Sequence, residues 1–462
     1  MNRDQPSVHP HSSISVLSQA VNFAVFLGAI AFVLLQFFPV TIDTRLWPLL
    51  FAVYVVTNRA QVRLSGIILM SAAFAFGIIA TLVLEVSVLD VLQSASFLFG
   101  FIMVIQYVGA TARGSPLVLQ AARAVVSQPE GRRYLFVSFG AHGLSLVLQM
   151  GGMLLVMALM SDRLKDEALD TMRSLATGAM RGFAATSLWS PLSLAILVIF
   201  TGVSGVSYMT YLPIGLAVTV CYLTLGYWME RMRRKKSGTR SAPQQVAESG
   251  NLVSLLPPVL GLVVCASATT WFLDLRMIEG VFIAALMLAV ISGGFAFVTG
   301  GRNLKESINT ITQTTSSCVN ELSIVVSAIF IGTVAGLAVA QFQLLGAQLS
   351  ARDAATVAGL IPLFMLAGGI IAMNPLVTAT FLVGTLDVVW PESAKLWLAL
   401  SLTWGWAIST CGAPYTANML MSSQLLSQPP HVLAIVWNGR FTLITIGIAC
   451  SVAAAGAYFA AV

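Results

Sequence analysis

The sequence predicts an all-α polytopic membrane protein, with about eleven transmembrane helices plus two re-entrant hairpins in two inverted-topology repeats. Of its 462 residues, 57% are hydrophobic and 9% are charged, whereas a soluble domain carries about 25% charged residues. The apolar residues form long runs, among them 23–40, 281–298 and 324–340. Each run approaches the roughly 20 residues that a helix needs to cross a bilayer. A water-soluble protein of this composition would have too few charges to cover its surface.

The basic residues indicate how the chain is oriented. They outnumber the acidic residues by 24 to 18, and they lie in short loops between apolar segments, as cytoplasmic loops of membrane proteins do. This pattern gives no reason to expect a nucleic acid as a partner. The clusters that we place in the cytoplasm are Arg59 with Arg63, 113–133, 163–173, 231–236, and Arg302 with Lys305. We expect a bacterial inner membrane, with the N-terminus in the cytoplasm and the C-terminus outside.

A charged segment at 229–251 reads as a basic cytoplasmic linker and divides the chain into two membrane repeats. After a cytoplasmic tail at 1–15, the first repeat covers 16–228 and the second covers 252–462. The helices expected outside the hairpins and broken helices are 16–40, 46–58, 66–84, 91–112, 205–228, 252–273, 277–299, 320–341 and 432–461.

Each repeat is expected to contain one re-entrant hairpin. Basic residues flank the apolar stretch 134–160 on both sides, so it is expected to enter and leave by the cytoplasmic face. The second hairpin is expected at 355–386. Only three spans precede it in its repeat instead of four, so it enters from the outer face, and the two repeats have opposite orientations.

Two short segments match one another without a gap, and each follows a predicted hairpin. One runs from Gly182 to Ser193 and the other from Gly405 to Thr416. Glycine, alanine and proline are identical between them, an aromatic residue faces an aromatic residue, and hydroxyl groups face hydroxyl groups at three positions. Upstream, Gln149 corresponds to the region of Asn374. Such internal similarity is typical of inverted repeats.

The prolines predict breaks in membrane helices. They are Pro191 in a broken helix at 176–200, Pro414 in a second at 396–427, and Pro375 in the second hairpin. Backbone groups freed by a break are tolerated only where they are buried in protein or line a polar cavity. There, oxygens can replace the water around Na⁺, and half-helix N-termini attract anions. The expected substrate and ion ligands are Gln149, Thr186, Ser187, Ser190, Ser193, Asn374, Thr378, Thr380, Ser409, Thr410, Gly412, Thr416 and Asn418.

These motifs and their order resemble the ion transporter superfamily, which includes the divalent anion/sodium symporters. The symporter hairpin tips carry Ser-Asn-Thr, which Asn374 with Thr378 and Thr380 resembles, whereas the first tip offers Gln149. The segment 410–418 is similar to the Gly-, Thr-, Pro- and Asn-rich broken helices of that family. The resemblance implies an elevator-type, ion-coupled transporter, often a homodimer, in which a domain of hairpins and broken helices slides against a scaffold.

Ionisable residues in apolar segments are candidates for coupling, and each has a structural alternative. Glu321 either carries a coupling proton or is an interfacial acid near Arg302. His142 either titrates near neutral pH or is simply hydrogen-bonded. Arg181 either attracts an anionic solute or extends to the interface. Serine, threonine and glycine also serve close helix packing in membranes, so packing is the alternative for every residue at the breaks.

We expect a Na⁺- or H⁺-coupled secondary active transporter of a small anionic solute, in contact with membrane lipid and without a cofactor or bound metal beyond the coupling ion. A cation/proton antiporter on the same fold is the alternative, although it needs a mid-span acid and most acids lie at segment ends. An enzyme is disfavoured because the chain has no HExxH motif and no pair of intramembrane acids. Its five cysteines are scattered singly, without metal-ligand spacing.

Overall fold

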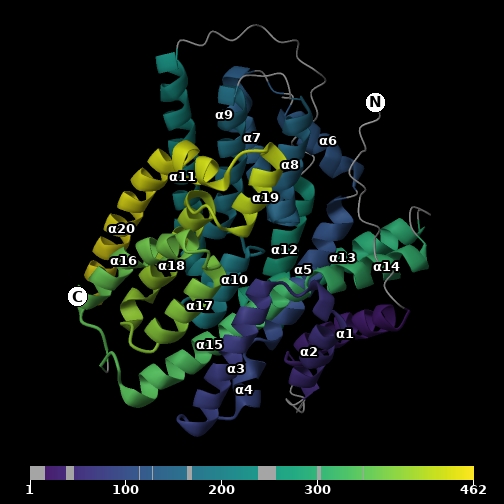
Figure 1. The fold of residues 1–462 in the computed structure, drawn as a ribbon, viewed down its shortest axis with the longest axis vertical. Helices are drawn as coiled ribbons and strands as arrows, with labels where there is room; N and C mark the ends of the chain where they lie inside the picture. Colours follow the sequence, from purple (N-terminus) through teal and green to yellow (C-terminus); the bar gives the residue numbers. More distant parts are fainter. Residues whose placement is uncertain are drawn as a thin grey trace, which may run out of the picture.

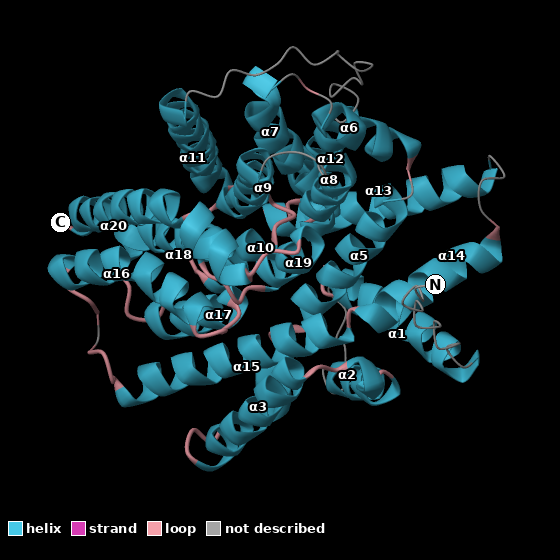
Figure 2. Ribbon diagram, turned by 45° about the horizontal axis from the view of Figure 1, so that its top comes forward, coloured by secondary structure: helices cyan, strands magenta, loops and turns pink. Residues whose placement is uncertain are grey.

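The computed structural model describes residues 16–37, 46–113, 115–126, 128, 130–163, 169–237, 256–298, 303–346 and 348–462. Every regular element in these ranges is a helix, and no strand occurs in them, as Figure 2 shows. The predicted all-α fold class is confirmed. The expected tail at 1–15 and the part of the expected linker beyond Ser237 lie outside the described residues.

The helices of the first half follow the apolar segments, with one helix divided and one added. Their bounds are α1 Val16–Leu35, α2 Leu46–Thr57, α3 Leu64–Leu82, α4 Val88–Gln93, α5 Ser96–Arg113, α6 Pro116–Val126, α7 Glu130–Leu148, α8 Met150–Arg163, α9 Leu169–Ala184, α10 Leu194–Gly202 and α11 Tyr208–Ser237. The helix expected at 91–112 is divided into α4 and α5. Helix α6 occupies a stretch expected to be a basic loop, because it buries one apolar face that includes Ala122 and Val125.

Helix α11 continues into the segment 229–251 that the sequence indicates as a linker. Charged pairs hold its last turns together. The Glu230 carboxylate accepts from Arg233 at 2.8 Å and from Arg234 at 3.1 Å, and Arg233 also pairs with Asp170 at the start of α9. Pairs three and four residues apart stabilise a helix, so the basic run is helical at its beginning.

The second half contains α12 Leu256–Leu273, α13 Met277–Val298, α14 Leu304–Ser317, α15 Val319–Phe342, α16 Ala351–Ile370, α17 Pro375–Leu386, α18 Lys395–Gly412, α19 Ala417–Leu426, a π-helical turn at Val432–Trp437, and α20 Gly439–Ala461. Helix α14 was not expected, because its sequence is polar. A capping box begins it: the Asn303 side chain accepts from the Glu306 N–H at 2.8 Å, and the Glu306 side chain accepts from the Asn303 N–H.

Seven helices in the described ranges are long and apolar enough to cross a membrane. They are Val16–Leu35, Leu64–Leu82, Val88–Arg113, Tyr208–Lys235, Val319–Phe342, Ala351–Ile370 and Gly439–Ala461. Shorter apolar helices accompany them, including the two arms of the first expected hairpin. The chain is therefore a polytopic membrane protein, whereas the number of about eleven spans stays a prediction.

One register relates the later elements of the two halves. Pro414 lies 223 residues after Pro191, and the same separation relates the first residues of α5 and α15 and those of α10 and α19. The residues with positive φ at the two hairpin tips are also 223 positions apart. Gln149 has φ 54° and Ala372 has φ 66°, a left-handed conformation that is rare for residues other than glycine. Gln149 therefore corresponds to Ala372, two residues before Asn374.

Glycines allow equivalent helices of the two halves to pack closely. A β-carbon at Gly182 of α9 would lie 2.2 Å from the Ser138 carbonyl oxygen of α7, and one at Gly405 of α18 would lie 2.8 Å from Met365 of α16. Each half-helix after a break packs on the second hairpin arm of the other half, α10 on α17 and α19 on α8. The two halves are thus interlocked at their breaks.

The helices form two groups in space (Figures 1 and 2). We call α6–α11 with α16–α20 the hairpin group, because it contains both hairpin-like pairs and both broken helices. We call α1–α5 with α12–α15 the flanking group, which lies toward the bottom and right of Figure 1. Helix α15 joins them, since it packs on α3 of the flanking group and on α17 of the hairpin group.

Candidate functional site

The first break lies where α9 and its 3₁₀ extension end and α10 begins, on either side of Pro191. Two tyrosines of α11 satisfy carbonyl groups that the break frees. Tyr211 donates to the Leu188 carbonyl at 2.6 Å and lies 2.7 Å from the Thr403 hydroxyl of α18. Tyr208 donates to the Trp189 carbonyl. Each of these carbonyl oxygens accepts a hydrogen bond from a tyrosine and so does not depend on a cation to be satisfied.

The tip of the first hairpin-like pair, between α7 and α8, also contacts this break. The Gln149 amide donates to the Leu192 carbonyl at 2.9 Å, so this predicted ligand serves the break itself. Thr186 donates to the Phe183 carbonyl at 2.7 Å. The other predicted hydroxyls, which are all buried, belong to Ser187, Ser190 and Ser193.

His142 of α7 is held by two hydrogen bonds. Its Nδ1 lies 3.0 Å from the Gly182 carbonyl oxygen, and its Nε2 accepts from the Trp189 indole N–H at 3.1 Å. A carbonyl requires a donor at Nδ1 and an indole N–H requires an acceptor at Nε2, so the contacts assign the neutral ring with its proton on Nδ1. This arrangement matches the alternative in which His142 is hydrogen-bonded within the structure.

The second break lies between α18 and α19, and three hydroxyl groups around it have no hydrogen-bond partner among the described residues. They belong to Thr378, Ser409 and Thr442, and we call them the second-break cluster. Ser409 is completely buried and Thr442 is 6% exposed. A buried hydroxyl without a partner costs about 1–3 kcal/mol, so the cluster is suited to receive an ion, a water molecule or a solute group.

Glycines make room for this cluster. A β-carbon at Gly369 would lie 2.5 Å from the Ser409 hydroxyl, and one at Gly368 would lie 2.7 Å from that of Thr378. On the other side, a β-carbon at Gly412 would lie 2.8 Å from the Thr442 hydroxyl. Single unpartnered hydroxyls occur elsewhere, for example at Ser138 and Ser145 of α7. Around the second break, three such hydroxyls each lie against a glycine.

The remaining polar residues of the second break stabilise its backbone. Asn418 donates to the Thr410 carbonyl at 2.8 Å, the Thr410 hydroxyl donates to Trp406 within its own helix, and Thr416 donates to Ala413 at 3.3 Å. Ser193 and Thr416 occupy equivalent N-cap positions, with φ −70° and −71°. The half-helices that follow the two breaks therefore begin with the same backbone conformation, whereas a 3₁₀ segment precedes only the first break.

The second hairpin tip brings only one of its three predicted ligands to the cluster. Thr378 faces Gly368. Asn374 is exposed, and its side chain caps α17 by accepting from the Leu376 N–H at 3.0 Å, with Pro375 as the first helical residue. Thr380 donates to the Leu376 carbonyl at 3.0 Å, and its backbone packs on α15.

Glu321 lies in the first turn of α15, in the flanking group and not at a break. It accepts a hydrogen bond from Gln106 of α5 at 2.7 Å. Within the described ranges it makes no ion pair. Arg302, the expected basic neighbour, lies outside those ranges.

Arg181 is the residue for which sequence reasoning was least informative. It is 5% exposed, so its side chain is enclosed by neighbouring helices. Its neighbours come from α7, α11 and α20. The sequence offered one indication of its role: Arg181 directly precedes the segment 182–193, which matches 405–416.

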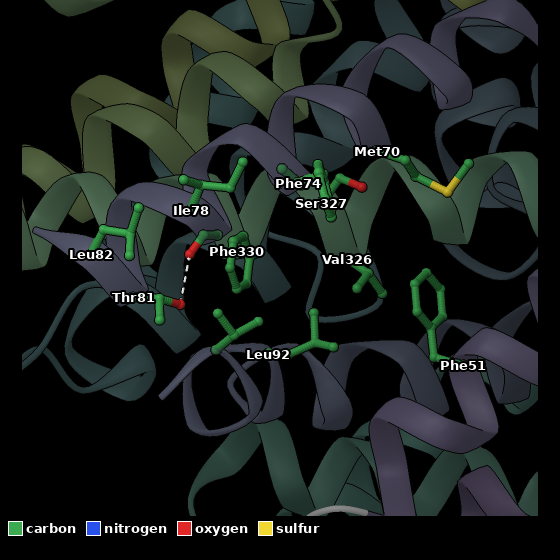
Figure 3. A pocket seen from close by; sticks show the side chains of 13 residues that line it. Phe51, Met70, Phe74, Ile78, Thr81, Leu82, Leu92, Val326, Ser327 and Phe330 are labelled. Atoms are coloured by element: carbon green, nitrogen blue, oxygen red, sulfur yellow. Dashed lines mark hydrogen bonds between the residues drawn. The ribbon is translucent and has the colours of Figure 1, made fainter. Parts of the chain in front are cut away.

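An apolar cavity of about 570 Å³ lies apart from the breaks, between α3 and α15 with α2 and α4 at its edge. Figure 3 shows Phe74, Ile78, Leu92 and Phe330 facing it. Thr81 and Ser327 bring hydroxyls to its lining, and the Thr81 hydroxyl donates to the backbone of α3 at 3.0 Å. This lining suits hydrocarbon and offers no charge to an anion.

Comparison with solved structures finds a similar fold. The crystal structure of the YdaH transporter of Alcanivorax borkumensis matches with a TM-score of 0.52 at 14% sequence identity, over 78% of this chain and 84% of that one. No protein-family model matches the chain, and no curated protein matches it. The chain therefore has the fold of a membrane transporter structure, recognisable in three dimensions and not in the sequence.

Proposed function

We propose that this protein is an ion-coupled secondary transporter of a small organic anion, with its binding site at the second break. The observation that carries the proposal is the second-break cluster, in which three hydroxyls without a hydrogen-bond partner among the described residues lie around a broken helix. The fold shared with a transporter structure and the common register of the two halves support it.

The chemistry of the second break suits both a cation and an anion. Hydroxyl oxygens and carbonyl oxygens are the hard ligands that Na⁺ takes in place of water. The N-termini of α10 and α19, which begin directly after the breaks, carry partial positive charge that favours an anion. A cation and an anion bound together also neutralise each other's charge in a medium of low dielectric constant.

An elevator movement of the hairpin group against the flanking group is part of the proposal, as the resemblance to the ion transporter superfamily implies. At the crossing of α15 and α17, which joins the groups, Gly332 and Gly336 face Gly384. No side chains interlock at these three positions, which favours a sliding contact. A homodimer in a bacterial inner membrane completes the proposal.

Uptake into proteoliposomes tests this function. The purified protein is reconstituted, and a panel of radiolabelled small organic anions is offered with an inward Na⁺ gradient, an inward H⁺ gradient or neither. We expect one anion to accumulate only when one of the gradients is imposed. Flux of an anion that is independent of both gradients would contradict ion coupling.

Two matched pairs of variants test the position of the site. Ser409→Ala and Thr442→Val remove hydroxyls of the cluster, and each is expected to weaken the apparent affinity for the coupling ion about tenfold, the equivalent of one lost ligand. Ser401→Ala and Thr445→Val are the controls on the same two helices, because their hydroxyls donate within their own helix. Equal effects in both pairs would place the site elsewhere.

Glu321 favours a cation/proton antiporter as the second candidate, because a half-buried carboxylate without an ion pair in the described ranges can carry a proton. A pH-sensitive dye inside the proteoliposomes would then report proton movement that depends on Na⁺ or K⁺. Glu321→Gln should abolish that signal under this candidate and leave anion uptake unchanged under the first.

A further inference from the structure

Arg181 is a buried cation whose contacts with the described residues are all to neutral groups. Its Nε donates to the Asn438 side-chain oxygen at 3.0 Å, and one terminal nitrogen donates to the Tyr134 hydroxyl at 2.9 Å. Its guanidinium carbon lies 4.2 Å above the centre of the Phe441 ring. These contacts hold the side chain in one orientation without neutralising its charge.

No carboxylate pairs with Arg181 in the described part of the chain. The acids of α9 and α11 nearest in sequence, Asp170 and Glu230, pair with Arg233 and Arg234 instead. Burying an unpaired charge costs several kcal/mol. A buried guanidinium is therefore expected either to be replaced during evolution or to meet an anion that is not part of the chain.

A glycine of α11 makes room for the Arg181 side chain. A β-carbon at Gly226 of α11 would lie 2.8 Å from the Tyr134 hydroxyl and 3.4 Å from the Arg181 side chain. The second terminal nitrogen of Arg181 makes no hydrogen bond with described residues, which leaves a donor for a ligand.

Arg181 also lies close to the second break, although it belongs to the first half. Phe441, on which it stacks, precedes Thr442, whose unpartnered hydroxyl faces Gly412 at the end of α18. Thr442 directly follows Phe441 in α20, so the ring that the guanidinium stacks on is next in sequence to one residue of the second-break cluster. The first half contributes the charge, and the second half contributes the hydroxyls.

We infer that Arg181 is the anion-binding residue of the solute site and that it binds a carboxylate group. This inference rests on the proposed transport function and names the class of its substrate. A planar guanidinium whose Nε and one terminal nitrogen are fixed by protein presents its remaining N–H groups to a carboxylate oxygen. The cost of burying the charge is then offset by the ligand when it is bound.

Thermal stability in the presence of small anions tests the inference without knowledge of the solute. The probes are acetate, inorganic phosphate and chloride as sodium salts, at equal ionic strength, with the purified full-length protein in detergent. Acetate at about ten times its dissociation constant is expected to raise the melting temperature by about 2 °C or more relative to chloride. No stabilisation of the wild type by acetate overturns the inference, and a stronger effect of phosphate than of acetate overturns the carboxylate assignment.

Substitutions of Arg181 test whether this residue is responsible for the response to acetate. Arg181→Gln and Arg181→Lys are expected to weaken the response to acetate at least about tenfold, because lysine keeps the charge but loses the planar fork. Arg173→Gln, on the same helix, is the control and should respond like the wild type. Equal responses of wild type and Arg181→Lys overturn the inference, and this variant keeps the test valid if Arg181→Gln fails to fold.

Uptake measurements separate this inference from the proposed function. Gradient-driven uptake of an anion without any Arg181-dependent response to acetate would refute the role of Arg181 alone. A response to acetate that depends on Arg181, in a protein for which no anion is driven by either gradient, would support the carboxylate site and refute coupled transport.

Discussion

Replacing Gly336 with leucine is expected to destabilise the protein by about 3 kcal/mol. A β-carbon at Gly336 would lie 2.2 Å from the Gly384 carbonyl oxygen, and one at Gly332 would lie 2.4 Å from the Thr380 carbonyl oxygen. Both neighbours are backbone atoms, so no change of rotamer relieves the overlap and α15 must move away from α17. The measurements are the melting temperature and the fraction of monodisperse protein after size-exclusion chromatography.

Gly447→Leu is the matched control for this prediction. Gly447 is a helical glycine of α20 that is exposed on the surface of the described chain, and a β-carbon there would have no neighbour within 4 Å. Its substitution is expected to leave the melting temperature nearly unchanged. If Gly336→Leu melted at the same temperature as Gly447→Leu, the close crossing of α15 and α17 would be wrong.

The second large effect is expected for Asn438→Leu, which should cost about 3 kcal/mol of stability. Asn438 is completely buried. It accepts from Arg181 and donates to the Leu433 carbonyl in the π-helical turn at 3.0 Å. Leucine would leave a buried guanidinium N–H and a buried carbonyl without partners. Thermal melting of the purified variant measures the loss.

A double-mutant cycle assigns this cost to the contact with Arg181. Combining Asn438→Leu with Arg181→Gln should cost less than the sum of the single substitutions, by about 1 kcal/mol or more, because the second change removes the group that the first leaves unpaired. Asn374→Ala serves as the contrast, since an exposed N-cap contributes only about 1 kcal/mol. Additive effects in the cycle would show that Asn438 and Arg181 are not coupled.

The sequence was sufficient to predict the fold class, because composition and apolar runs alone determine that the helices must lie in a bilayer. The positions of the breaks also follow from local chemistry. Pro191 and Pro414 cannot continue a helical hydrogen-bond ladder, and the helices resume at Leu194 and Ala417. Helices α6 and α14 were missed because neither is apolar throughout, and packing on one face or a capping box decides their formation.

Which side chains belong to the candidate site could not be predicted from the sequence. Ser409 and Thr410 are adjacent in one helix, yet Thr410 bonds to its own helix whereas the Ser409 hydroxyl faces Gly369 of another. That difference depends on how α16 packs on α18. Arg181 illustrates the same limit: its partners lie 47 and 257 residues away in the chain, so its burial depends on tertiary contacts that no local pattern encodes.

The difference between the two breaks bears on the energetics of a transport cycle. Tyr208, Tyr211 and Gln149 donate to backbone carbonyls of the first break. The second break has the three hydroxyls of the second-break cluster, for which the described residues supply no hydrogen-bond partner. Under the proposed function, a single cation at the second break would accompany each solute. Symport of a monocarboxylate is then electroneutral and insensitive to membrane voltage. A dicarboxylate would carry one net negative charge inward against an inside-negative potential, at about 2.3 kcal/mol per 100 mV.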